Sequence, residues 1–125
     1  MDSLTLARSA YGAPTDATRT PRETEYDVFA RCTRLLRSAA AQGQAGFPAL
    51  VRAIHDNRAL WTTLAVDVAD PGNALPETLR ARIFYLAQFT AQHSQRVLTG
   101  GADVEPLVFI NTTIMRGLRP EAVSA

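Results

Sequence analysis

Apolar residues recur at steps of three and four along most of this chain, and no stretch alternates apolar and polar residues as a half-buried strand would. Four segments carry this helical period strongly, and turn-forming residues separate them. We expect these four helices at residues 21–42, 47–69, 76–99 and 103–117. A weaker helical pattern covers residues 3–11. The pattern therefore predicts an all-α fold, a small antiparallel bundle of four helices with a weaker N-terminal helix.

The helix boundaries rest on residues with particular backbone requirements. Thr20 is a suitable N-cap, and Glu23 completes a capping box three residues later. Pro71 pushes Asp70 out of helical geometry and so ends the second long helix. These boundaries divide the chain into an N-terminal segment and linker (1–20), a helical domain (21–118) and a flexible tail (119–125).

The two central helices each carry a narrow seam with alternating steps of three and four residues, the spacing of helices that pack at a shallow angle. The seams are Phe47, Leu50, Ile54, Asn57, Trp61, Leu64 and Val68, and Leu79, Ile83, Leu86, Thr90, His93 and Val97. Folding this hairpin about residues 73 and 74 places Asn57 opposite Thr90. We interpret the pair as a polar layer that fixes register at a cost in stability. Replacing both residues with Leu is then expected to raise the melting temperature.

Charge and composition exclude several classes of protein. The chain has 13 basic residues, all Arg, against 12 acids, so its net charge of +1 gives no field to attract nucleic acid or an anionic membrane. The single Cys32 cannot form an internal disulfide, and no secretory signal or spanning apolar run is present. We therefore expect a reduced, soluble protein of the cytoplasm that does not insert into membranes.

Residues that could carry catalysis or bind a metal are few and scattered. His55 and His93 lie far apart with no Cys near either, whereas a zinc site needs three or four ligands at short spacings. Cys32 falls on the apolar face of its helix, where it behaves as a small hydrophobic residue. No phosphate-binding loop or nucleophile motif is present. We expect neither an enzyme nor a cofactor.

Two groups of charged residues each allow two interpretations. Asp67 and Asp70 lie at the helix end that disfavours acids. We favour a local role, in which they pair with Arg80 or Arg82 across the turn or Asp70 caps the next helix; the alternative is an acidic site that a basic partner group recognises. Arg31, Arg34 and Arg37 form a ridge that is typical of a solvated helix face. Phosphate binding usually requires more positive charge and an aromatic stacking platform, so direct RNA binding is disfavoured.

Two helices carry more apolar residues than one seam requires. Phe84, Tyr85 and Phe89 lie off the seam of the third long helix, and Phe109 and Met115 lie off the main stripe of the last one. Either the third long helix is central and packs on several neighbours, or a groove stays open for a partner's amphipathic helix. The residues alone leave both alternatives open.

The central block resembles a known family. It contains Leu60-Trp61-Thr62-Thr63-Leu64-Ala65, then Asp70-Pro71, Asn73-Ala74-Leu75-Pro76 and Leu79-Arg80-Ala81-Arg82. This block resembles the central signature of the FlaF family of flagellar biosynthesis regulators, and the resemblance extends over roughly residues 21–118. It implies a protein of bacterial flagellar assembly that promotes flagellin production and acts opposite a companion repressor, FlbT. It also implies binding of flagellin in the cytoplasm before export, in a chaperone-like role.

Joined to the surplus apolar surface, this resemblance suggests that a groove holds an amphipathic terminal segment of flagellin. The residue pattern, not the family, gives the candidates for this groove: Tyr26, Phe29, Phe84, Tyr85, Phe89, Phe109 and Met115. One alternative is a translational regulator that contacts flagellin mRNA through Arg31, Arg34 and Arg37, aligned with Arg80 and Arg82. Another is a homo-oligomer that buries the surplus surface on itself.

Overall fold

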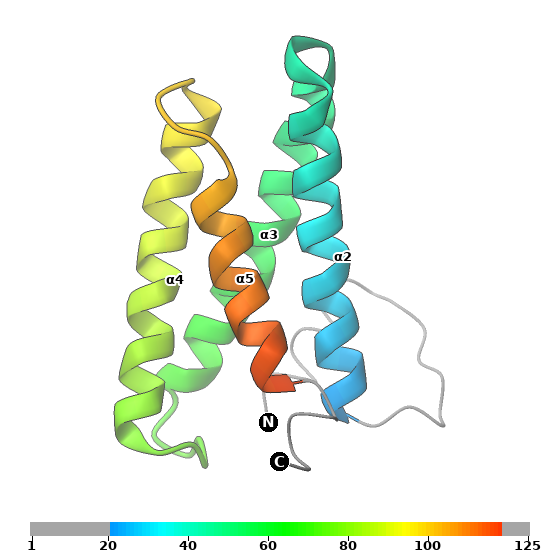
Figure 1. The fold of residues 1–125 in the computed structure, drawn as a ribbon. Coiled ribbons are helices and arrows are strands. Elements are labelled where there is room, and N and C mark those ends of the chain that lie inside the picture. Colours follow the sequence, from blue (N-terminus) through cyan, green and yellow to red (C-terminus); the bar gives the residue numbers. More distant parts are fainter. Residues whose placement is uncertain (1–20, 119–125) are drawn as a thin grey trace.

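A computed structural model describes residues 21–118, so the predicted helix at 3–11 and the tail at 119–125 lie outside the described part of the chain. Within it, the four predicted long helices are all present (Figure 1). They are α2 (Pro21–Ala41), α3 (Phe47–Ala69), α4 (Glu77–Leu98) and α5 (Glu105–Leu118), with a short 3-10 turn, η1 (Gly43–Gly46), between the first two. Each end lies within two residues of its predicted position, and the described residues contain no strand. The all-α prediction is confirmed.

The helices form two layers. The antiparallel hairpin of α3 and α4 makes the most extensive contacts, followed by the pairs α2–α5 and α2–α3. Contacts between α4 and α5 are few. In Figure 1, α5 lies in front of α3, between α4 and α2. One face of the hairpin is therefore covered by α2 and α5.

The turn between α3 and α4 uses its polar residues locally. The carboxylate of Asp70 accepts a hydrogen bond from the Gly72 backbone at 2.9 Å. The side-chain amide of Asn73 donates to the backbone oxygen of Asp67 at 3.2 Å and to its carboxylate at 3.3 Å. Arg80 donates to the carbonyl oxygens of Val68 and Asp70, so a positive charge lies at the negative end of α3. Both carboxylates therefore take part in the turn, as the favoured interpretation expects, but Asp70 does not cap α4, whose N-cap is Pro76.

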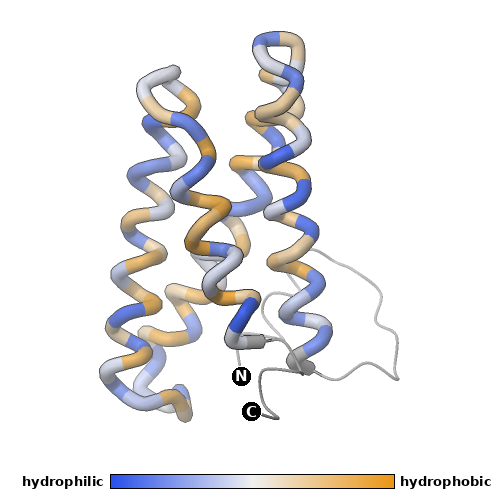
Figure 2. Tube along the Cα trace, viewed as in Figure 1, coloured by the Kyte–Doolittle hydropathy of each residue, from blue (hydrophilic) through white to orange (hydrophobic). Residues whose placement is uncertain are grey.

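The core forms two clusters, one of which contains Trp61 and the other Leu36. Apolar and hydrophilic segments alternate along the helices, as expected for amphipathic helices (Figure 2). The Trp61 ring meets the edge of Phe29 with centroids 5.8 Å apart and planes at 78°. The α3 seam is buried from Ile54 to Val68 and the α4 seam from Thr90 to Val97, whereas their first residues, Phe47 and Leu79, are exposed.

A chain of buried polar side chains joins α3 to α5. The indole nitrogen of Trp61 donates to the Asn111 side-chain oxygen at 2.9 Å. The Asn111 amide nitrogen in turn donates to the side-chain oxygen of Asn57 at 2.8 Å. Asn57 and Thr90 are both buried, as a polar layer requires. However, Asn57 bonds to α5, and the Thr90 hydroxyl has no hydrogen-bond partner within residues 21–118.

These bonds change the result expected when Asn57 and Thr90 are both replaced with Leu, for which the sequence predicted a higher melting temperature. Removing Asn57 would leave the buried Asn111 amide without an acceptor, so that replacement should lower the melting temperature. The buried Thr90 hydroxyl, like the Asn57 amide nitrogen and the Ser94 hydroxyl, has no hydrogen-bond partner within residues 21–118, and it can be removed without breaking a bond. We expect Thr90→Val to raise the free energy of unfolding by about 1 kcal/mol, because Val keeps the shape and removes the buried hydroxyl.

Chemical denaturation measures this change, and Thr33→Val is the matched control. Thr33 is also buried, but its hydroxyl donates to the Phe29 carbonyl oxygen at 2.8 Å, so the control should lose stability. A loss of stability in Thr90→Val as well would show that its hydroxyl is hydrogen-bonded in solution.

Candidate partner-binding groove

A groove follows the side of the α3–α4 hairpin that α2 and α5 do not cover. Its central hollow has a volume of about 340 Å³ and is lined only by residues of these two helices. The hollow nearest the turn shares Ala69 and Phe84 with the central one. The hollow at the opposite end shares Arg58 and Thr62 with it. We call this line of three adjoining hollows the hairpin groove.

The walls of the hairpin groove have the spacing of a helix-packing seam. On α3 the lining residues include one row at steps of four and three, namely Val51, His55, Arg58, Thr62, Ala65 and Ala69. On α4 the lining residues include Ala81, Phe84, Gln88 and Ala91. This spacing is typical of helix faces against which another helix packs. The small side chains leave room for large side chains of that helix. The hairpin groove is therefore shaped for a helix.

The groove is also apolar and long. Val66 is 62% exposed and Phe84 40% exposed, which places apolar surface in contact with water. From Val51 to Ala69, α3 advances about 27 Å, so the groove matches a partner helix of about five turns. An exposed apolar hollow with polar residues at its edge is a common feature of interaction sites.

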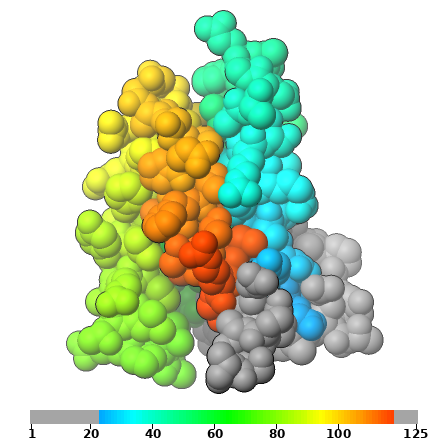
Figure 3. All heavy atoms as spheres, in the orientation of Figure 1, coloured from blue at the N-terminus to red at the C-terminus, as the bar shows by residue number. Residues whose placement is uncertain are grey.

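The predicted groove residues do not come together in one place. Phe84 lines the hairpin groove, whereas Met115 lies in a separate cleft between α2 and α5, beside Thr33. Tyr85 and Phe109 are exposed, at 66% and 68%, on α4 and α5. Figure 3 shows α5 filling the space between α4 and α2 on the face it presents.

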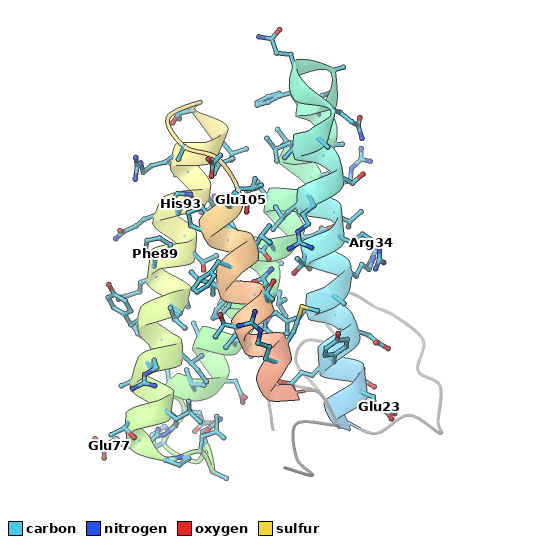
Figure 4. The ribbon with its side chains drawn as sticks, viewed as in Figure 1. Glu23, Arg34, Glu77, Phe89, His93 and Glu105 are labelled. Atoms are coloured by element: carbon cyan, nitrogen blue, oxygen red, sulfur yellow. The ribbon has the colours of Figure 1, made fainter. Side chains whose placement is uncertain are left out.

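Three further predicted residues are, like Met115, partly or fully buried. Phe29 is 0% exposed and belongs to the core, so its prediction as a groove residue is corrected. Tyr26 is half-buried on α2. Phe89 is half-buried and stacks on His93 one turn later, with ring centroids 5.5 Å apart (Figure 4).

The prediction missed most of the groove because it searched for large aromatic residues. Its walls are mainly small or β-branched, and large residues would have filled the hollow. A signal was present in the sequence: Thr62, Ala65 and Ala69 repeat at heptad spacing beside the Trp61 seam. A second stripe of small residues next to a large-residue seam indicates a second packing face.

The arginines of α2 do not form the surface that the RNA-binding alternative requires. Arg31, Arg34 and Arg37 are exposed, and Figure 4 shows Arg34 on the side of α2 away from α4. Arg80 is half-buried and hydrogen-bonded to the α3–α4 turn. Since α2 and α4 lie on opposite sides of the bundle, the predicted alignment with Arg80 is not formed (Figure 1).

The described residues show no arrangement suited to metal chemistry. His93 is buried and its Nε2 lies 2.8 Å from the Asp103 carbonyl oxygen, whereas His55 is exposed. Within residues 21–118, no three His, Cys, Asp or Glu side chains lie close enough to hold a metal ion. None of the helices in that part of the chain is long and apolar enough to cross a membrane.

The comparison with protein families finds a match over most of the chain. Residues 7–118 match the family described as flagellar protein FlaF. This match spans all the residues of the hairpin groove and of the buried polar chain. No curated protein and no solved structure matches the chain.

Proposed function

The chain belongs to the FlaF family, and from this premise we propose that it binds flagellin in the cytoplasm in a chaperone-like role. In this role it promotes flagellin synthesis, export and filament assembly. It acts as a binding protein and not as an enzyme. FlbT is a second proposed partner, to which we assign no surface.

The observation that carries this proposal is the hairpin groove. Unassembled flagellin is expected to have flexible terminal segments that become amphipathic helices in the filament. Such a segment could lay its apolar face into the groove, where it would cover exposed residues such as Val66 and Phe84. Covering that face on flagellin would prevent premature polymerisation.

The mode of binding also suits later release. A flexible segment that becomes helical on binding loses conformational entropy, which lowers the affinity obtained from a given buried area. The complex can then form one-to-one and still give up flagellin to the export machinery.

Calorimetric titration with monomeric flagellin tests the proposal. We expect one-to-one binding with a negative heat-capacity change, as apolar burial requires. Flagellin lacking the terminus that docks should not bind, whereas flagellin lacking the other terminus should bind normally. Absence of binding to every form of flagellin would overturn the proposal.

A substitution inside the groove tests the site itself. Ala91 is exposed and lines the central hollow, so Ala91→Trp should fill it without disturbing the core. We expect a loss of flagellin affinity of about a hundredfold, equivalent to about 3 kcal/mol. Ala40→Trp is the matched control, because Ala40 is exposed on α2 outside the groove. Equal affinity of the two variants would place flagellin elsewhere.

A further inference from the structure

Arg58 occupies a distinctive position in the hairpin groove. It is exposed and lines both the central hollow and the hollow that reaches Val51. Within residues 21–118 it has no hydrogen-bond or ion-pair partner. No Asp or Glu is among the residues that line these two hollows. These two hollows therefore hold a positive charge that no acid in their own lining neutralises.

A helix docked in the groove would remove water from this guanidinium group. Removing water from an unpaired charge is costly in free energy. A carboxylate on the docked helix would offset this cost, because it can accept two parallel hydrogen bonds from the guanidinium group. An entirely apolar helix would thus be disfavoured beside Arg58. From this we infer that the groove selects an amphipathic helix of flagellin whose apolar stripe is flanked by a carboxylate, and that Arg58 pairs with that carboxylate. This inference rests on the proposed function.

The place of Arg58 in the groove fixes where that carboxylate falls. Arg58 lies about 10 Å along α3 from Val51 and about 16 Å from Ala69. The acidic residue therefore sits about two helical turns from the end of the bound segment that lies near Val51 and Leu98. The rest of the stripe faces small side chains such as Ala65 and Ala91, so large apolar residues are expected there.

Charge reversal at position 58 tests the pairing. Arg58→Glu should weaken binding of monomeric flagellin about tenfold or more and reduce the salt dependence of the affinity, because an attractive pair becomes a repulsive one. Arg52→Glu is the matched control: Arg52 is exposed on the same helix but lines none of the three hollows. Calorimetry at two salt concentrations measures both variants, and thermal unfolding checks that they remain folded.

Reversal on the partner completes the test. Acidic residues in the docking segment of flagellin are replaced by Arg one at a time, and one of these variants should restore binding to Arg58→Glu. If Arg58→Glu binds like the control while Ala91→Trp abolishes binding, flagellin occupies the groove but the charge pairing is wrong. If the unmodified protein fails to bind flagellin, the proposed function fails. If light scattering shows a dimer that Ala91→Trp dissociates, a second copy of the chain covers the groove and the inference is overturned as well.

Discussion

Replacing Asn111 with Leu should lower the free energy of unfolding by about 2–6 kcal/mol, because two buried polar groups lose their partner at once. The Asn111 oxygen accepts the indole proton of Trp61, and its amide nitrogen donates to Asn57. All three side chains are almost completely buried, so water cannot replace either bond without entering the core. A loss of this size is a large fraction of the stability of a small domain.

A combined variant separates the lost hydrogen bonds from any effect on packing. Trp61→Phe, Asn57→Leu and Asn111→Leu together remove all the polar side-chain groups that form these two hydrogen bonds. Replacing both partners of a hydrogen bond by apolar groups can be nearly neutral. The triple variant should therefore be more stable than Asn111→Leu alone in chemical denaturation. If Asn111→Leu costs less than about 1 kcal/mol, the bonds seen here contribute little in solution.

The sequence was sufficient for the features that depend on neighbouring residues. Helix ends follow from local backbone chemistry, such as the Asp70–Pro71 stop, and they lie within two residues of prediction. The burial of both Asn57 and Thr90 also follows from local spacing on two consecutive helices. What the spacing could not supply was the partner of Asn57, because Asn111 lies 54 residues further along the chain. A register calculated for two helices contains no information about a third.

The groove was missed for a related reason. Apolar residue counts show that α4 has surplus hydrophobic surface, but they do not show which neighbours cover it. Phe84 remains exposed beside the groove, whereas Phe89 packs against the core and His93. A hollow forms where side chains are small, so Ala65 and Ala91 mark it better than any aromatic residue.

Phe29 tests most directly whether a residue belongs to the core or to the groove. The sequence analysis assigned it to the groove, whereas in the structure it is buried in edge-on contact with Trp61. Phe29→Ala should cost about 3–5 kcal/mol of unfolding free energy, since the aromatic ring is lost and a cavity remains. Chemical denaturation measures this loss. The same substitution at a half-exposed groove residue would lower the free energy of unfolding much less.

The binding measurement then separates the two roles, and it requires a variant that stays folded. Phe29→Leu keeps most of the buried apolar volume, so its loss of stability should be smaller than that of Phe29→Ala. Because Phe29 lies in the core and does not line the hairpin groove, Phe29→Leu should bind monomeric flagellin with unchanged affinity. Ala91→Trp should show the reverse pattern, with stability kept and binding lost. If Phe29→Leu stayed stable yet lost flagellin binding, the partner would have to enter the bundle between α2 and α3, and the groove would not be the docking site.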